Sequence, residues 1–177
     1  MKAVIDTNVL LVANEQADVS PDCVAECVRR LQAMQKAGVT VIDDDFRILG
    51  EYLHKTSLHP PKGVGDKFLK WLLRQTSTGR VEHVALTELA EHCFAEFPDP
   101  TLEPRFDAPD RKFVAVAHAH PDKPAIWQAA DCKWLDWWPA LGKKGITVDF
   151  LCPDDACMVY RKKFPKRPAP ALPNHPA

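Results

Sequence analysis

Four acidic side chains stand where a protein of alternating strands and helices could use them for chemistry. Asp6 ends the first apolar run, Glu51 lies in a stretch with helical spacing, Asp110 begins a helical stretch, and Asp131 ends another apolar run. Open parallel sheets bind ligands beyond the carboxyl ends of their strands, which is where Asp6 is expected. Carboxylates that gather at such an edge raise one another's pKa values. A divalent cation reverses that cost, and oxygen ligands suit Mg²⁺ or Mn²⁺.

A simpler interpretation of Asp6 is structural. The sequence Asp6-Thr7-Asn8 follows a strand-like run, and Asp and Asn are good caps for the start of a helix. Taken alone, this segment supports a helix cap and a site residue about equally. The surrounding elements and the other three acids are needed to decide between them.

The elements expected around these acids alternate between strands and helices. Strands are predicted at 2–6, 39–42, 124–129 and 146–151, and helices at 21–34, 44–56, 64–76, 110–119 and 132–141. Residues 82–87 fit either a short strand or the lead into a helix through Phe94, and 97–109 is predicted to be a loop. This alternation favours an α/β fold with three α/β/α layers, in which a central, mostly parallel sheet is covered on both faces.

The same residues resemble the PIN-domain family of metal-dependent ribonucleases. The resemblance rests on Val4–Leu10, on Glu51, on Asp110 heading the helical stretch 111–117, and on Ala130–Trp134 after a strand. It covers residues 1 to about 151. The Asp-Thr-Asn start alone is a weak signal, whereas the ordered set of four acids in matching contexts is much more specific.

The resemblance implies a metal-dependent endoribonuclease that hydrolyses RNA phosphodiester bonds, with Mg²⁺ or Mn²⁺ as cofactor. Its catalytic and metal-binding residues are then Asp6, Glu51, Asp110 and Asp131. In two-metal hydrolysis the ions lie roughly 3.5–4 Å apart and stabilise the attacking and leaving oxygens at phosphorus. Members often carry a second Asp two residues after the last strand's Asp, and here that place is Lys133. Asp136 is the candidate replacement as a metal ligand.

Four further side chains are candidates for binding the substrate, because they adjoin the acids: Asn8, Arg111, Lys112 and Lys133. The cations among them could hold substrate phosphates at the edge of the site. A solvated surface charge is an equally good interpretation of each. The family also implies possible partners, which are RNA, a cognate antitoxin if the chain is the toxin of a toxin–antitoxin pair, and a second copy of the chain.

Two other classes of function stay open. A haloacid-dehalogenase-like phosphotransferase also begins with a strand that ends in Asp, but it needs a second Asp two residues later, and Asn8 stands there. The other alternative is a catalytically inactive PIN-fold protein that binds RNA or acts as a scaffold. Lys133 gives that alternative some weight, whereas the retention of four acids argues against it.

Composition narrows the class of protein without naming a function. The chain has 177 residues, 46% of them hydrophobic, and a formal net charge of −1, as in one ordinary globular domain. No run approaches the roughly 18 apolar residues of a spanning helix, and the first residues begin a strand rather than a signal peptide. The expected location is therefore the cytoplasm, with no membrane partner.

Six cysteines are present without any Cys-x-x-Cys pair, so neither a zinc ribbon nor a disulfide framework is predicted. Cys23 and Cys27 are spaced to share one helix face, where buried thiols are the simpler interpretation.

The carboxyl-terminal end differs from the rest in charge. Residues 161–177 hold five Lys or Arg, five Pro and no acid, so this segment carries +5 and residues 1–160 carry −6. The expected organisation is a PIN-like nuclease domain at 1–160 followed by a basic, Pro-rich, flexible tail. Such a tail could steer a polyanion toward a metal site, although a solvated tail without a role is the more common case.

Overall fold

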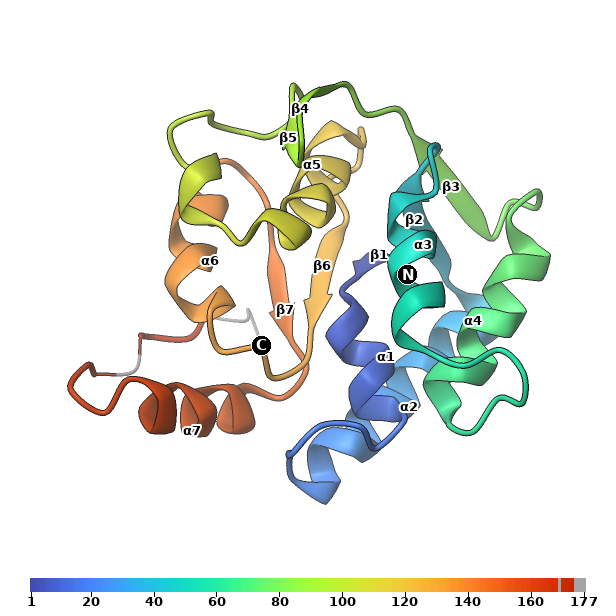
Figure 1. Cartoon of the computed structure of the whole chain (residues 1–177), viewed down its shortest axis with the longest axis horizontal. Coiled ribbons are helices and arrows are strands. Elements are labelled where there is room, and N and C mark those ends of the chain that lie inside the picture. Colours follow the sequence, from blue (N-terminus) through green and yellow to red (C-terminus); the bar gives the residue numbers. More distant parts are fainter. Residues whose placement is uncertain (169, 174–177) are drawn as a thin grey trace.

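The computed structural model describes residues 1–168 and 170–173 and arranges them around one parallel β-sheet (Figure 1). The sheet has five strands in the order β3-β2-β1-β6-β7. Their bounds are Lys2–Ile5 (β1), Val39–Asp43 (β2), Val81–Val84 (β3), Ala125–Gln128 (β6) and Val148–Phe150 (β7). All neighbouring strands are parallel, which confirms the expected α/β class.

Strand β1 lies at the centre of the sheet, and its Ala3, Val4 and Ile5 are fully buried. The chain moves outward from β1 through β2 to β3 and then returns to the other side of β1 with β6 and β7. Ile5 pairs with Trp127 of β6, so the carboxyl ends of β1 and β6 lie side by side. This reversal makes the β1/β6 junction the switch point at which open α/β sheets bind ligands.

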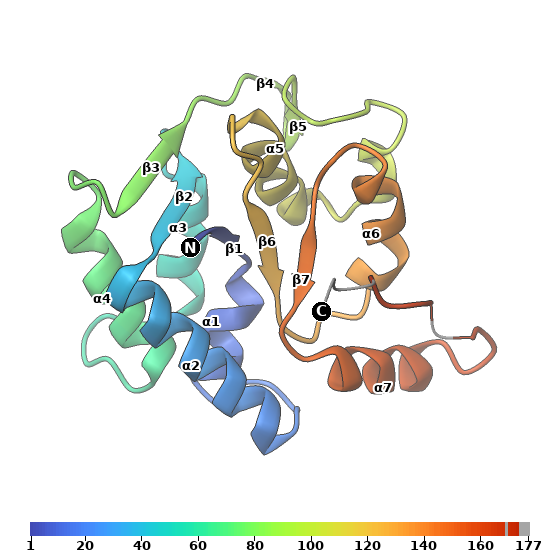
Figure 2. The same ribbon diagram turned by 180° about the vertical axis from the view of Figure 1, so that it is seen from behind.

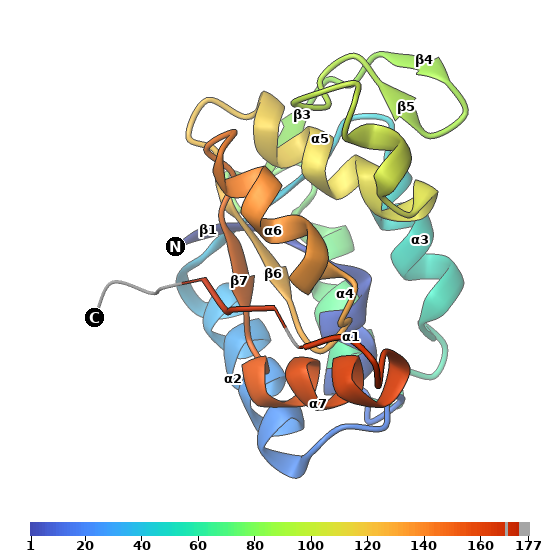
Figure 3. The ribbon, with the colours of Figure 1, turned by 90° about the vertical axis from the view of Figure 1, so that its left-hand side faces the viewer.

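Seven α-helices flank the sheet within the described residues: Thr7–Ala13 (α1), Pro21–Ala37 (α2), Arg47–Lys55 (α3), Val64–Gln75 (α4), Arg111–Ala119 (α5), Trp134–Gly142 (α6) and Pro153–Lys163 (α7). Helices α1, α2 and α4 contact one another, whereas α5 packs against β1, β2 and β6. The views from behind and from the side show helices on both sides of the sheet (Figures 2 and 3). This arrangement agrees with the expected three layers.

Local signals fix the helix starts nearest the sheet. The carboxylate of Asp6 accepts a hydrogen bond from the backbone N–H of Asn8 (2.7 Å) and caps α1. The Ser20 hydroxyl accepts one from Cys23 N–H, and Pro21 follows at the first helical position of α2. The helix-cap interpretation of Asp6 is therefore confirmed, and it leaves one carboxylate oxygen of Asp6 outside this bond.

Several segments differ from the sequence-based expectation. The undecided stretch 82–87 contributes strand β3, which ends at Val84. A short antiparallel hairpin, β4 (Glu88–Ala90) and β5 (Cys93–Phe94), was not predicted. The expected loop at 97–109 contains the 3₁₀ turn Glu103–Arg105 and the start of a second, Ala108–Asp110, which leads into α5. These elements are too short to leave a periodic pattern.

Helix α7 also was not predicted, although its ends carry clear signals. Pro153 opens it, two Asp stand in its first turn, and three basic residues stand in its last turn. The expected boundary between residues 160 and 161 therefore falls inside a helix. Beyond α7, the indole N–H of Trp138 donates to the Ala171 carbonyl (2.9 Å). Residues 169 and 174–177 of the expected flexible tail lie outside the described residues.

No helix in the described part of the chain combines the length and apolar character needed to cross a membrane.

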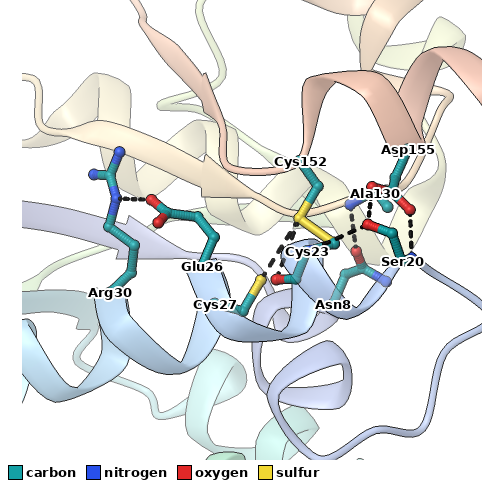
Figure 4. The surroundings of a disulfide bond; sticks show 9 residues. All are labelled: Asn8, Ser20, Cys23, Glu26, Cys27, Arg30, Ala130, Cys152 and Asp155. Atoms are coloured by element: carbon teal, nitrogen blue, oxygen red, sulfur yellow. Dashed lines mark hydrogen bonds and ion pairs between the residues drawn. A yellow bond between two sulfur atoms is a disulfide. The ribbon is translucent and has the colours of Figure 1, made fainter.

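The expectation of six cysteines without a disulfide framework, with Cys23 as a buried thiol, is wrong for one pair. Cys23 in α2 and Cys152, the residue before α7, are joined by a disulfide (Figure 4). They are 129 positions apart, so no local spacing in the sequence could predict this disulfide. The fold brings them together because Asp155 of α7 accepts hydrogen bonds from the backbone and hydroxyl of Ser20, at 2.6 and 2.7 Å. Cys27, the predicted buried thiol, is free and fully buried.

Candidate active site

Asp6 and Asp131 follow the two strands that meet at the switch point. The backbone N–H of Asp6 donates to the Trp127 carbonyl (3.0 Å), which extends the β1–β6 pairing up to the acid. Asp6 is 5% exposed, and Asp131 is half-buried. Glu51 reaches the same region from α3, and Asp110 from the start of α5. Asp6, Glu51, Asp110 and Asp131 are called the acidic cluster below.

Asn8, expected to bind substrate, has a positioning contact in the structure. Its side-chain oxygen accepts a hydrogen bond from the backbone N–H of Ala130 (3.0 Å). Ala130 directly precedes Asp131, so this bond ties the first turn of α1 to the segment that carries the acid. The contact fixes Asp131 relative to Asp6.

Residues at the carboxyl end of β1 hold Glu51 and its helix in place. The hydroxyl of Thr7 donates to Glu51 Oε1 (2.5 Å), and the hydroxyl of the next residue, Tyr52, donates to the Ile5 carbonyl. Tyr52 is fully buried, so it anchors α3 against the end of β1. Helix α3 thereby presents Glu51 toward the strand end that carries Asp6.

The acids of the cluster act on one another electrostatically. Burial raises the pKa of Asp6 well above its usual value, and the charges of Asp110, Glu51 and Asp131 raise it further, against the hydrogen bond from Asn8. Burial, followed by the charges of Asp131 and Glu51, raises the pKa of Asp110 to about 7. The four acids therefore form one region of negative charge, because like charges at close range raise one another's pKa values.

Lys112 supplies the positive charge within this site. Its Nζ atom contacts Glu51 Oε2 and the Pro109 carbonyl, and its side chain is only 7% exposed. Its charge opposes the rise in the pKa of Asp110. A buried ammonium needs such partners because desolvation otherwise disfavours it. Lys112, expected to bind substrate, is therefore the internal counter-ion of the acidic cluster.

The donor set fits a hard divalent cation, although the carboxylates are not drawn together as ligands of one ion. Among the described residues, one group of three or more His, Cys, Asp or Glu has its ligand atoms within 4.8 Å of one another, and that group is made of cysteines. The acidic cluster is more open than this. Its oxygen donors, burial and mutual repulsion suit Mg²⁺ or Mn²⁺, while Lys112 now neutralises Glu51.

The candidate fifth acid, Asp136, is engaged elsewhere. It is exposed, and its carboxylate accepts a hydrogen bond from the hydroxyl of Tyr160 in α7 (2.8 Å). Asp107, in contrast, acts on the acidic cluster, because its charge contributes to the raised pKa of Asp110. Asp107 was not predicted as a site residue, although an acid three residues before Asp110 in a turn-rich segment was a usable signal.

The remaining two substrate-binding candidates also have partners. Lys133 Nζ pairs with Asp107, and this contact raises the pKa of Lys133. Arg111 donates through its guanidinium to the Phe106 carbonyl at 3.2 and 3.3 Å. Lys133 therefore borders the acidic cluster with a half-exposed cation, whereas Arg111 fastens the start of α5 to the segment before it.

A scan against protein-family models, a search of curated proteins and a search of solved structures each found no match to this chain.

Proposed function

We propose that the chain is a Mg²⁺- or Mn²⁺-dependent endoribonuclease of PIN type. The observation that carries the proposal is the proximity of four acids near the switch point of a parallel sheet, two that follow β1 and β6, one in α3 and one just before α5. Burial and the charges of the other acids raise the pKa values of Asp6 and Asp110. The four acids bring negative charge together in a partly buried region, which is unfavourable without a cation, and Lys112 neutralises only part of that charge.

In the proposed mechanism, Asp6, Glu51, Asp110 and Asp131 would hold the metal, and a bound metal would supply an activated water and stabilise charge at phosphorus. Asp6 can serve while it caps α1, because the cap bond uses only one of its oxygens. Thr7 and Asn8 keep Glu51 and Asp131 in place. Lys112 releases Glu51 and is then free to contact a phosphate of the substrate.

Cations near the cluster support a nucleic-acid substrate. Helix α7 carries Arg161, Lys162 and Lys163 in its last turn. The charge of Lys163 acts on the Cys132 thiol, which is next to Asp131 in the sequence. Phosphate contacts depend chiefly on charge, and the basic turn, together with Lys133, would align an RNA backbone beside the acids.

Within this proposal, a toxin role with a cognate antitoxin and a homodimer rest on the family resemblance alone. The cytoplasm remains the proposed location. The alternative is a PIN-fold scaffold that binds RNA without cutting it, and the pairing of Lys112 with Glu51 favours it to a degree, since the chain neutralises part of its own acidic cluster.

The test compares Asp6→Asn with Asp18→Asn on single-stranded RNA in Mg²⁺ and in Mn²⁺. Asp18 is exposed in the connection between α1 and α2, so it is a matched control for the loss of one carboxylate. We expect cleavage by the wild type and by Asp18→Asn, and a loss of about 10²–10³-fold or more in Asp6→Asn, as for removal of one group that stabilises the transition state. Equal cleavage by all three proteins would remove Asp6 from the mechanism. RNA binding without cleavage by the wild type would establish the scaffold.

A further inference from the structure

Three cysteine sulfurs lie together in the same surroundings as the Asn8–Ala130 contact (Figure 4). Cys23 and Cys27 stand one turn apart on α2, and Cys152 precedes α7. The Cys23–Cys152 disulfide uses two of the sulfurs, and the third, Cys27 Sγ, lies 3.9 Å from Cys152 Sγ. All three sulfurs lie within 4.8 Å of one another. These residues are called the cysteine cluster below.

The spacing of the cysteine cluster matches the ligand shell of a thiolate-bound metal. A tetrahedral zinc site with Zn–S bonds of about 2.3 Å places its sulfurs roughly 3.8 Å apart. The Cys27–Cys152 separation of 3.9 Å is already close to that value. Thiolates select soft cations such as Zn²⁺ over Mg²⁺. A third thiol beside the pair is unnecessary for a disulfide, but it is needed for such a site.

The surroundings give a cation access to Cys23 and Cys152, whereas Cys27 is fully buried and does not border the groove. A groove of about 490 Å³ opens over Cys23 and Cys152 and is bordered by acidic side chains, which are Asp22, Glu26, Asp154 and Asp155. Glu26 and Asp155 are held by Arg30 and Ser20, so they shape the groove. Asp22 and Asp154 are exposed at its rim. Their charges attract cations, and the opening leaves room for a water molecule as a fourth ligand.

We propose that the cysteine cluster is a Zn²⁺ site that the Cys23–Cys152 disulfide closes. In the reducing step, two molecules of a small thiol, RSH, become RSSR while the disulfide gains two electrons and two protons. Zn²⁺ then binds three thiolates and releases three protons to solvent. In reducing compartments disulfides are rare, and grouped cysteines are more often metal ligands. The site does not depend on the nuclease proposal.

The experiment is a Co²⁺ titration of full-length, chelator-treated protein, oxidised or reduced with a thiol-free phosphine. Sulfur-to-cobalt charge-transfer absorption reports thiolate ligands, so the acidic cluster, which offers only oxygen, is silent. Cys27→Ser removes one proposed ligand and leaves the disulfide pair in place. Cys157→Ser is the matched control, because Cys157 is free and lies outside the cysteine cluster. Circular dichroism of each sample checks the fold.

We expect the reduced wild type and Cys157→Ser to bind one Co²⁺ with charge-transfer bands that one equivalent of Zn²⁺ bleaches. Cys27→Ser should bind Co²⁺ more than about 100-fold more weakly, beyond the loss typical of an outer-shell partner. The oxidised wild type should show no such bands. Absent bands in the reduced wild type, whether folded or unfolded, would overturn the proposal. So would equal affinity in Cys27→Ser, or equal bands in the oxidised protein.

Discussion

The acidic cluster and the cysteine cluster are two groups of potential metal ligands built in different ways. The acidic cluster is spread over four elements, its carboxylates are not drawn together, and a lysine of the same chain neutralises part of its charge. The cysteine cluster is compact and already joined by a covalent bond. The two clusters are close neighbours near the carboxyl ends of β1 and β6. Asn8 and Ala130, whose hydrogen bond positions Asp131, also belong to the surroundings of the disulfide (Figure 4).

The difference shows how a protein keeps ligand atoms together in the absence of an ion. Carboxylates repel, so burial must be offset by a cation, and Lys112 serves that purpose. Sulfurs can instead bond to each other, which removes their charge altogether. Stability in the two regions should therefore depend on different agents, which are cations for the acidic cluster and redox state for the cysteine cluster.

The largest expected effect comes from opening the cysteine cluster with Cys23→Ala/Cys152→Ala. The disulfide closes a loop of 129 residues in the unfolded chain, and in the chain-entropy account a loop of this size contributes about 5 kcal/mol. We expect the free energy of unfolding in urea, measured in a chelator, to fall by about that amount. Cys157→Ala is the control. A loss equal to that of the control would mean that the pair does not constrain the chain.

The second effect addresses the acidic cluster through Lys112→Met, which keeps the length of the side chain and removes its charge. Breaking a buried ion pair leaves an unpaired charge and typically costs 3–5 kcal/mol. Because the Glu51 side chain is 21% exposed, we expect about 3 kcal/mol in chelator. Mn²⁺ should restore much of this stability, since it replaces the missing cation.

The exposed Lys67→Met in α4 serves as the control for the change of residue type. Urea unfolding of both variants, with and without Mn²⁺, gives the comparison. If Mn²⁺ stabilises Lys112→Met no more than the wild type, then Lys112 and the metal do not compete for the same carboxylates.

The sequence predicts features that depend on neighbouring residues, and it does not predict contacts between distant parts of the chain. Four of the five strands of the sheet, most helices and the four candidate acids were visible because each depends on a run of neighbouring residues, such as the apolar run that ends at Asp6. The cysteine cluster was not, because Cys152 is 125 positions from Cys27 and only the fold joins them. The roles of Lys112 and Asp107 were missed for a similar reason, since contacts with Glu51 and Lys133 cross between elements.

A smaller effect should separate Asp107 from Asp136 as the fifth acid of the cluster. Asp107 acts on Asp110, whereas Asp136 accepts a hydrogen bond from Tyr160. We expect Asp107→Asn to weaken Mn²⁺ binding about tenfold, at the low end for an outer-shell group. Asp136→Asn should leave the affinity unchanged within error. Calorimetric titration of both variants with Mn²⁺ decides the point, and a greater loss in Asp136→Asn would restore Asp136 as the candidate metal ligand.

The smallest effect concerns Asp66, a buried carboxylate outside the acidic cluster that has a structural role. It accepts hydrogen bonds from the backbone of Ser57 and Lys62 and from the side chain of Asn14, at 2.7–3.0 Å. Burial alone would raise its pKa, but these donors outweigh burial and lower the pKa.

Because the folded pKa of Asp66 is depressed, the stability that ionised Asp66 contributes is present above its unfolded pKa of about 4 and is lost as pH falls through the folded value. Asp66→Asn should therefore reduce the free energy of unfolding by about 1 kcal/mol at neutral pH, since an amide keeps part of the bonding, and by less in acid. Urea unfolding across this pH range is the measurement. A difference that stays constant down to about pH 2 would mean that the charge of Asp66 contributes nothing, and that donors alone do not distinguish a structural carboxylate from those of the acidic cluster.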